Sequence, residues 1–560
     1  MNPKLSWRQQ AVSVALLGAT LISGCSGDSS PDSGLISTTP NSGSQAAEPN
    51  AQVTARFAEA LQADTVDSST FVVDQEGAAV AGTVSYDANE HEARFVASAP
   101  LEFLTPYRAT LSGSILTSDG QPIDSAQWHF RTRDGRWSDE VALPKAIADA
   151  ETREFGGLAF GPDGRSWLVW EELRGGSASV WVAQRQAGGS AWDTPVRLFL
   201  DDLGAIDTMH YPVHLQPRIA INAHGVATVV WQELNRPGED DPVQSYIWAA
   251  RWDGSAWSEA ERIGAPGVGS GSSALVAVDG GDHSLVVWNQ SVLAEGAVQL
   301  WAQRFTNGTG WSTPEKIGEA RPWETRLEMA ADGSARAIWQ ESNATNLWAA
   351  DFDGQGTWTS PTRLVTTAIP GSFTSQQRPD HSSVVVWTQN EGNRLTSQWW
   401  SIRQADGQWT SAARLDDDME SHDIAVTPTG DILMGYVKAV EGSNAEVYTR
   451  RLAAGSGSWT TPVRLVSQTG AAPASRQIKI AVDDKGRGLL AFEQFLTTGS
   501  EHRLWTSRLA DPSGDSWSEP QQRLDKNRLL TGLVVGPHGR ASLVLRREDM
   551  GEDFADMRFD

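Results

Sequence analysis

The sequence has little that could cross-link the chain, attract nucleic acid or provide a familiar catalytic motif. It contains a single cysteine, which excludes an intramolecular disulfide and leaves sheet packing as the source of stability. Lys and Arg number 45 against 70 Asp and Glu, and no basic run occurs, so the electrostatic footprint of a nucleic-acid-binding protein is missing. No nucleophile elbow, phosphate-binding loop or His-Glu-x-x-His helix is present.

The N-terminal segment has the pattern of an export signal. Lys4 and Arg8 precede a mostly apolar run, residues 11–22. This run is too short to cross a bilayer of about 30 Å as a helix, and its length is typical of the apolar core of a signal peptide. We therefore predict a signal peptide over residues 1–24.

The only cysteine follows this segment directly. Residues 21–25, Leu-Ile-Ser-Gly-Cys, resemble the lipobox of bacterial lipoproteins. The resemblance implies cleavage before Cys25, lipid on its thiol and an acylated amino group, which together would anchor the chain to a membrane. Ser26, in place of aspartate, implies the outer membrane; the alternative is a secreted protein with an incidental cysteine. Residues 25–34, mainly Ser, Gly, Asp and Pro, are expected to form a flexible tether.

Residues 35–132 alternate short apolar runs with turn residues. Strands are predicted at 53–57, 70–73, 80–86, 93–96, 107–112 and 127–132. Six short strands over about 100 residues are typical of a β-sandwich. The order of motifs, from Val-Thr-Ala-Arg-Phe (53–57) to Trp-His-Phe-Arg-Thr (128–132), resembles the SbsA-like bacterial Ig-like family first seen in surface-layer proteins. The resemblance implies a spacer or adhesive domain rather than an enzyme.

A tryptophan-marked motif recurs through residues 133–560. Each copy has Trp followed by Ser, Thr or Asp, often Pro three residues after the Trp, then a basic residue and Leu or Ile. The marking residues are Trp137, Trp192, Trp257, Trp311, Trp358, Trp409, Trp459 and Trp517. Three further apolar runs lie between copies, so each unit of roughly 50 residues has four strands, as a propeller blade does. One blade cannot cover both faces of its sheet, so these tryptophans are expected to fill the layers between stacked blades.

The two ends of this region predict how the blades close into a ring. Residues 529–535, 541–546 and 553–559 supply three strands and then the chain stops, whereas residues 137–143 supply one strand at the front. Together these segments would form one composite blade, which hides the edge strands. The predicted fold class is therefore all-β: an Ig-like β-sandwich followed by an eight-bladed β-propeller closed by a composite N- and C-terminal blade.

The tryptophan turns resemble the degenerate Asp-box of sialidase-like propellers, most closely at residues 134–137 and 406–409. A sialidase resemblance would imply three arginines that clamp a carboxylate, a Tyr nucleophile with a Glu partner, and an acid. Arg218, Arg326 and Arg476 lie at comparable starts of first strands. However, the usual Arg-Ile-Pro motif is missing, and the six tyrosines offer no distinctive Tyr/Glu arrangement. No catalytic residue is therefore predicted.

Two groups of polar loop residues raise the question of a metal site. One combines three histidines and three aspartates, namely His210, His214, His224, Asp201, Asp202 and Asp207, but in a loop between blades rather than on a helix. The acidic runs 239–241 and 416–418 lack the spaced oxygens that Ca²⁺ uses. Solvated loops are expected in both cases, and no metal or other cofactor is predicted.

Two functions remain open. The first is a non-catalytic binding or scaffold lipoprotein of the cell envelope, which presents the propeller to a protein or glycan; loops 201–216, 235–245 and 291–298 would form its recognition rim. The alternative is a surface glycoside hydrolase or lyase of sialidase-like type that uses the central funnel. The expected partners are the membrane, through the lipid anchor, and an unidentified protein or glycan. The two functions predict different funnels. Acidic and basic residues that converge at the funnel would favour catalysis, whereas a diffuse polar lining would favour binding.

Overall fold

The computed structural model describes most of the chain after the N-terminal 33 residues. The described residues are 34–148, 150, 152–174, 177–202, 215–235, 244–264, 271–292, 297–318, 322–341, 346–364, 370–392, 395–417, 419–440, 444–467, 477–495, 502–524, 528–547 and 553–560. They include two 3₁₀ helices, η1 (Ala63–Thr65) and η2 (Pro537–Gly539), and no helix long and apolar enough to cross a membrane. The chain divides into two compact units: one takes in the chain up to Ser44 with 51–98 and 107–130, the other 45–50, 99–106 and 131–560.

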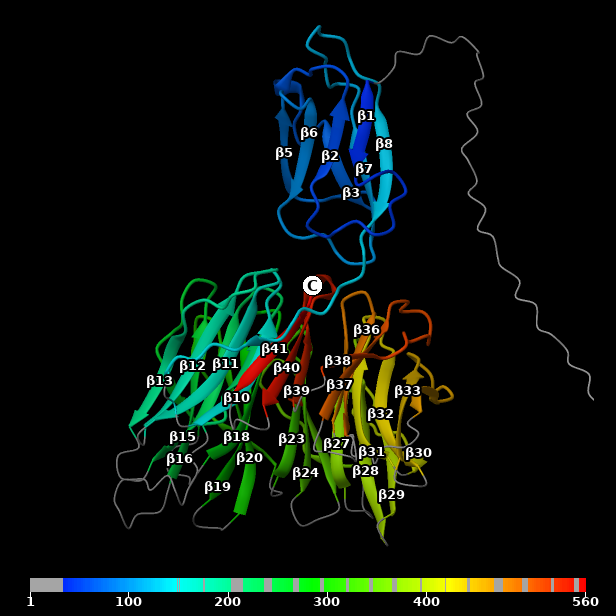
Figure 1. Ribbon diagram of the computed structural model, residues 1–560. Helices are drawn as coiled ribbons and strands as arrows, with labels where there is room; N and C mark the ends of the chain where they lie inside the picture. The colour runs from blue at the N-terminus through cyan, green and yellow to red at the C-terminus, as the bar shows by residue number, and fades with distance from the viewer. Residues whose placement is uncertain are drawn as a thin grey trace, which may run out of the picture. The chain divides into compact units, whose positions relative to one another are not determined.

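The first unit is a sandwich of two four-stranded antiparallel sheets (Figure 1). One sheet has the order β1 (Leu35–Thr39), β2 (Val53–Phe57), β6 (Glu92–Ala97), β5 (Gly82–Asp87), and the other β4 (Ala78–Ala79), β3 (Phe71–Gln75), β7 (Pro106–Leu111), β8 (Ala126–Arg131). Phe71 lies between the sheets, with ring centroids 6.3 Å from Phe95 and 5.9 Å from Trp128. The six predicted strands are present, and β1 and β4 were not predicted.

The described residues of the second unit form eight sheets of antiparallel strands, and seven of these sheets are meanders that follow one another in chain order. The first four are β10 (Thr152–Phe160), β11 (Ser166–Arg174), β12 (Ser177–Arg185), β13 (Val196–Asp202); β14 (Arg218–Ile221), β15 (Ala227–Asn235), β16 (Gln244–Trp252), β17 (Glu261–Ile263); β18 (Gly271–Val278), β19 (Ser284–Val292), β20 (Ala297–Thr306) with β21 (Gly310–Trp311) and β22 (Glu315–Gly318); and β23 (Pro322–Met329), β24 (Ala335–Glu341), β25 (Leu347–Phe352), β26 (Thr362–Arg363). The next three are β27 (Pro370–Gln377), β28 (Ser383–Gly392), β29 (Leu395–Arg403), β30 (Ala413–Asp417); β31 (Met419–Val426), β32 (Ile432–Val440), β33 (Asn444–Leu452), β34 (Val463–Ser467); and β35 (Ile478–Val482), β36 (Gly488–Phe495), β37 (His502–Leu509), β38 (Gln521–Leu524).

The last sheet joins the two ends of this unit. Its order is β39 (Arg528–Val535), β40 (Ala541–Arg547), β41 (Phe554–Phe559), β9 (Val141–Ala142). Ala142 pairs with Ala555, and Trp137 forms a bridge with Phe559, so a segment that precedes the first sheet completes the last one. This pairing agrees with the strand predicted at 137–143.

The sheets follow one another around a closed circuit. We call β10, β14, β18, β23, β27, β31, β35 and β39 the inner strands; each lies beside the next in this order, and β39 lies beside β10. The second strand of each sheet is almost continuously buried, as in β11 and β24, because it is covered on both faces. The arrangement is propeller-like, with separate sheets stacked around a centre and no sheet closed into a barrel.

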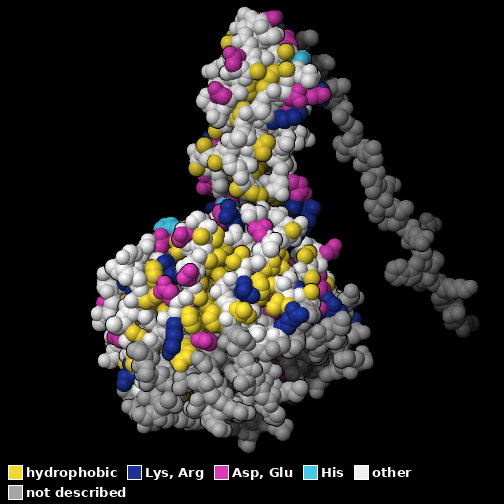
Figure 2. Space-filling view, turned by 90° about the vertical axis from the view of Figure 1, so that its left-hand side faces the viewer, with side chains coloured by type: hydrophobic (Ala, Val, Ile, Leu, Met, Phe, Trp, Pro, Cys, Tyr) yellow, Lys and Arg dark blue, Asp and Glu magenta, His cyan; other side chains and the backbone are white. Residues whose placement is uncertain are grey.

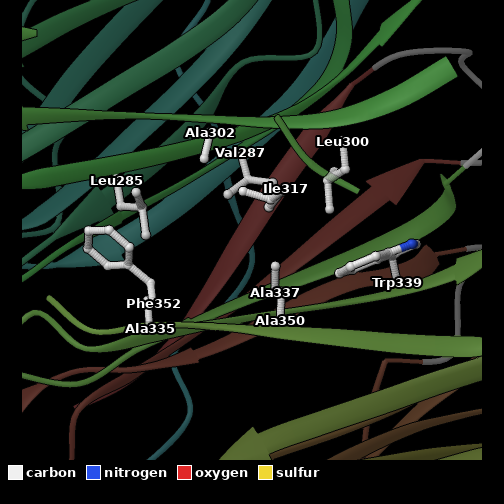
Figure 3. Packing of buried hydrophobic residues seen from close by; sticks show 10 residues of the cluster. All are labelled: Leu285, Val287, Leu300, Ala302, Ile317, Ala335, Ala337, Trp339, Ala350 and Phe352. Atoms are coloured by element: carbon white, nitrogen blue, oxygen red, sulfur yellow. The ribbon is translucent and has the colours of Figure 1, made fainter. Parts of the chain in front are cut away.

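Hydrophobic clusters join each sheet to its neighbour. In the cluster shown in Figure 3, Leu285 and Val287 of β19 meet Ala337 and Trp339 of β24. The cluster between the first and last sheets includes Val544. All eight repeat tryptophans are half-buried and pack against such clusters. Burial of aromatic area between sheets is the main stabilising contribution expected of these residues.

An ion pair reinforces the junction where the chain ends meet. Arg185 of β12 donates to Asp556 of β41 at 2.5 Å, and the side chains are only 2 % and 0 % exposed. The same guanidinium donates to the Ser542 hydroxyl at 3.0 Å. These contacts connect the first sheet to the last without a covalent link.

Candidate functional site

Every inner strand ends in the same five-residue turn. The N–H of its first residue donates to the carbonyl of the fifth, as in Ala330 to Ser334 and Arg378 to Ser382. The first residues of the eight turns are Gly161, Asn222, Asp279, Ala330, Arg378, Thr427, Asp483 and Gly536. Because the turns are equivalent, counting back from them aligns the inner strands level by level.

A cavity of about 880 Å³ opens between four successive inner strands, β23, β27, β31 and β35, and their turns. Its size is within the range of ligand sites, roughly 300–1,000 Å³. The lining mixes charged and amide side chains, such as Arg326, Glu328 and Gln376, with apolar ones such as Val426 and Val482. We call it the channel cavity.

Several inner strands carry a charged residue at the same level, four residues before the turn. That level holds Gly157, Arg218, Leu275, Arg326, Thr374, Asp423, Lys479 and Gly532. Two residues nearer the turn the level is mostly alanine, with Glu328 and Gln376 as the polar members. Arg218 and Arg326 are exposed although they lie on innermost strands, which indicates that this level faces the open centre.

Arg326 is held in place from two sides. It donates to Glu324 at 2.6 Å, and its guanidinium carbon lies 5.5 Å from the Phe373 ring centroid on the next inner strand. A guanidinium over an aromatic face is attracted by the ring quadrupole. Arg326 is therefore positioned at the wall of the channel cavity by its ion pair with Glu324 and its contact with the Phe373 ring.

Arg218 lies in a smaller cavity of about 110 Å³. It donates to the carbonyl oxygens of Pro217 at 2.9 Å and Gly156 at 3.2 Å. Gln216 and Ser273 line the same cavity with φ of 48° and 54°, a left-handed conformation that is strained for residues other than glycine.

Burial disfavours the ionised form of two carboxyl groups near the centre. Burial raises the pKa of Asp423, which accepts an N–H bond from Ile480 at 3.1 Å, while the charges of Lys479 and Arg326 oppose the shift. Burial also raises the pKa of Glu328, whose carboxylate accepts the Ser383 hydroxyl at 2.5 Å. Desolvation disfavours the ionised carboxylate in both cases.

The structure describes two of the three arginines singled out from the sequence, and they line different cavities. Arg218 and Arg326 occupy equivalent positions on their inner strands, whereas Arg476 lies outside the described residues. Lys479 is the further cation at this level, and sequence reasoning missed it together with Asp423. Counting back four residues from each turn would have found both.

The polar loop groups lie elsewhere. Of the three histidines in the first group, only His224 is described; it lies in the turn after β14, and its Nδ1 is 3.0 Å from Asp282 in the turn after β18. His210, His214 and Asp207 lie outside the described residues, as do Cys25, the run 239–241 and most of the three predicted rim loops. Among described residues, no group of three or more His, Cys, Asp or Glu could hold a metal ion.

Asp416 corrects one expectation. The run 416–418 was expected to be a solvated loop tip, but Asp416 belongs to β30 and its side chain is only 16 % exposed. It accepts bonds from Lys438 at 2.6 Å, Arg450 at 3.1 Å and the Tyr436 hydroxyl at 3.2 Å. The carboxylate thus stabilises the junction between two sheets, a role that the sequence run does not reveal.

A Tyr/Glu contact also exists that the sequence did not single out. The Tyr448 hydroxyl donates to Glu446 two residues earlier on β33, and Arg464 lies 3.2 Å from the same carboxylate. Neither Tyr448 nor Glu446 lines the channel cavity. The pair therefore gives the cavity no nucleophile.

Hydrophobic side chains also reach the outer surface. Figure 2 shows them gathered on one side of the sheets, interspersed with charged groups. Val196 and Leu200 of the outermost strand β13 are 51 % and 48 % exposed. The channel cavity, which combines charged and amide side chains in a concave site, is the stronger candidate.

Comparison with known proteins identifies the first unit. Residues 30–132 match the family model Big_5, bacterial Ig-like domain, which confirms the Ig-like prediction. The match covers this segment alone. A search of curated proteins returned no match.

Several solved structures show limited similarity to the chain. "Hadza microbial sialidase Hz136" is 12 % identical, with 69 % of this chain and 90 % of that chain covered and a TM-score of 0.33. A structure titled as a new family of polysaccharide lyase, PL25 ulvan lyase, is 9 % identical, with coverage of 75 % and 95 % and a TM-score of 0.41. The β-propeller domain of the Trilobed protease from Pyrococcus furiosus is 11 % identical, with coverage of 60 % and 91 % and a TM-score of 0.38.

Proposed function

We propose that the protein is a cell-envelope lipoprotein that binds a glycan in the channel cavity without transforming it. The observation that carries this proposal is the lining: guanidinium, amide, carboxyl and hydroxyl groups from four successive inner strands converge beside apolar walls. A few convergent polar groups on a largely apolar surface are typical of sites for small ligands. Sugars offer many hydroxyls for such groups and apolar ring faces for such walls.

The remaining architecture belongs to this proposal. We take residues 35–132 as an Ig-like stalk and residues 133–560 as an eight-bladed propeller with a composite last blade. Eight sheets on a closed circuit and the pairing of Ala142 with Ala555 support this reading. Lipidation of Cys25 after a signal peptide 1–24, a tether 25–34 and an outer-membrane location rest on residues 21–26.

Labelling with an alkyne fatty acid tests the anchor. We expect label on the wild-type chain in the outer-membrane fraction and none on Cys25→Ser. Label on the serine variant, or a wild-type chain free in the periplasm, would contradict lipidation at this residue.

A glycan array followed by titration tests the site. Arg326→Gln should weaken binding of the best glycan at least about tenfold, since a lost charge-assisted contact has that order of effect. Arg414→Gln serves as a matched control, because Arg414 is half-exposed and pairs with Asp417 on the outer strand β30, away from the cavity lining. Unchanged binding by Arg326→Gln would contradict the proposed site.

One observation favours a second function, a glycoside hydrolase or lyase. Asp423 and Glu328 are carboxyl groups at the centre with raised pKa, the property of a general acid. Incubation with a panel of glycans tests it. Turnover that Glu328→Gln or Asp423→Asn abolishes would replace the binding proposal with catalysis, and no turnover with retained binding would support the binding proposal.

A further inference from the structure

The last tryptophan-marked copy contains one residue more than the others between its tryptophan and its basic residue. In six copies the basic residue follows the tryptophan by five positions, as Arg464 follows Trp459, and Leu or Ile comes next. In the last copy Arg523 follows Trp517 by six positions. An inserted residue moves the side chains that come after it to different positions in the strand.

The insertion places Arg523 at the bulge of the outer strand β38. Gln522 pairs with Trp505 and Leu524 pairs with Leu504, so Arg523 is the extra residue between them. The residues at the same bulge in four other sheets are Leu198, Ile317, Leu415 and Leu465. Each of these packs into a hydrophobic cluster between sheets. Arg523 therefore brings a cation to a position where the repeat otherwise buries an apolar side chain.

No acid balances the charge of Arg523 among the described residues. Its side chain is half-buried, and it donates from Nε to the Thr506 hydroxyl and from Nη2 to the amide oxygen of Gln521, both at 2.8 Å. Burial lowers the pKa of Arg523, and no described carboxylate acts against that shift. Nη1 makes no hydrogen bond to a described residue and keeps accessible surface. A cation that is partly withdrawn from water without a counter-charge is costly, so its position requires an explanation.

Arg523 lines a pocket of about 400 Å³ between the seventh sheet and the composite last sheet, which we call the rim pocket. Its aromatic walls are Trp137, Trp517 and Phe559. Asp134 is the one carboxylate among the described lining residues, and its two oxygens each lie 3.3 Å from a nitrogen of Arg508. Two arginines against one aspartate leave the lining with an excess positive charge, in a chain whose formal net charge is −25.

An equivalent pocket between the fourth and fifth sheets has the opposite charge. Residues 406 and 407 line it where residues 134 and 135 line the rim pocket. Its two arginines, Arg336 and Arg403, both pair with Asp351, and three further aspartates line it. Of these two equivalent pockets, the one with the inserted residue is the positive one.

The lining of the rim pocket indicates the chemistry of a ligand. A carboxylate or sulfate group would supply the missing counter-charge at Nη1 of Arg523. The apolar faces of a sugar ring suit the aromatic walls, and the Ser516 hydroxyl, which bonds no described residue, is available to a sugar hydroxyl.

We propose that the rim pocket is a second ligand site, which binds an acidic sugar through an ion pair between its carboxylate or sulfate group and Arg523. The rim pocket and the channel cavity share no lining residue, and no inner-strand turn lines the rim pocket. The proposal is therefore independent of binding in the channel cavity.

Calorimetric titration of the full-length chain with D-glucuronate and with glucose 6-sulfate tests the proposal. The comparison ligands are D-glucose, which lacks the charge, and inorganic sulfate, which lacks the ring. We expect the better acidic sugar to bind at least about tenfold more tightly than either comparison ligand. Which acidic sugar is better shows whether the group is a carboxylate or a sulfate.

Arg523→Leu is the sharpest variant, because it introduces the kind of side chain that other copies have at the bulge. We expect it to remain folded, with a urea midpoint no lower than that of the wild type, and to lose the preference for the acidic sugar. Arg523→Gln should lose the preference too, and it keeps the test valid if the leucine variant does not fold. Arg414→Gln, which changes the basic residue of a copy with the ordinary spacing, should bind as the wild type does.

Three results would overturn the proposal. They are acidic sugars that bind no better than glucose, inorganic sulfate that binds as tightly as the better acidic sugar, and undiminished binding by the folded Arg523 variants. Binding that Arg326→Gln abolishes and Arg523→Leu retains would place the acidic sugar in the channel cavity. That outcome would support the proposed function and overturn the second site.

Discussion

Two parts of the ring differ in the charge that their inner strands place at the centre. Where the chain ends meet, the inner strands β10 and β39 present Gly157 and Gly532 at the charged level, and ionic groups lie between the sheets, as in Arg185–Asp556. In the half formed by β23, β27, β31 and β35, ionic groups also lie between sheets, as Asp416 does, but the inner strands add charged groups such as Arg326 and Asp423 at that level. One repeated scaffold thus separates a closing half from a ligand-facing half.

This difference has a physical reason. The closing half joins the two ends without a disulfide or a continuous chain, so paired charges and packing must hold it. Charges buried as a pair are strongly coupled to stability, because either one alone is costly to bury. Partly paired charges at an open centre contribute little to stability and remain available to a ligand.

Asp556→Asn breaks the closing half and has the largest expected effect. It leaves Arg185 buried without its ion partner, which costs about 3–5 kcal/mol of unfolding free energy. Urea unfolding followed by tryptophan fluorescence measures the loss. The control is Asp417→Asn, which removes a half-exposed pair with Arg414 and should cost less than about 1 kcal/mol. Equal losses in the two variants would mean that the closing pair has no special role.

His422→Gln lies in the ligand-facing half and should have an intermediate effect on the free energy of unfolding. Burial lowers the pKa of His422 on β31 to about 4, below the unfolded value of about 6.5. Between these values the unfolded chain binds a proton that the folded chain does not, so stability is present above pH 6.5 and falls on acidification, by at most about 3 kcal/mol. Unfolding curves at pH 7 and pH 4.5 should differ less for the variant than for the wild type. An unchanged difference would exclude His422 as the cause.

Glu328→Gln should change the free energy of unfolding least. Its dependence on pH should have the opposite sign to that of His422. Burial raises the pKa of Glu328, so the folded state holds its proton to higher pH than the unfolded state does. The contribution of this group is therefore favourable in acid and is lost as pH rises through the folded pKa. The neutral variant should be more stable than the wild type at pH 7 and gain less from acidification. A variant less stable than the wild type at pH 7 would contradict this assignment.

The repeated architecture was predictable because its signal is repeated. The Trp turns recur eight times, and the three strands left at the C-terminus need the segment at Trp137, which pairs with Phe559. In the first unit, β1 and the two-residue β4 were missed because short edge strands need few apolar residues. Their hydrogen bonds come from neighbouring strands rather than from a local pattern.

The site was only partly predictable. Arg218 and Arg326 could be picked out as arginines at the starts of first strands, but Asp423 and Lys479 are ordinary charged residues until the turns align the inner strands. The pairing of Asp416 with Lys438 and Arg450 could not be predicted either, because these partners come from the neighbouring sheet. Pairing of this kind is a property of three-dimensional contacts, not of spacing.

Hydrogen exchange of the full-length chain, with and without the glycan that binds best in the array, tests the functional division of the ring most directly. The account predicts slower exchange in the turns after β23, β27, β31 and β35, around Ala330, Arg378, Thr427 and Asp483, and no change in those after β10 and β39. Protection confined to the closing half, or equal protection of all eight turns, would contradict it.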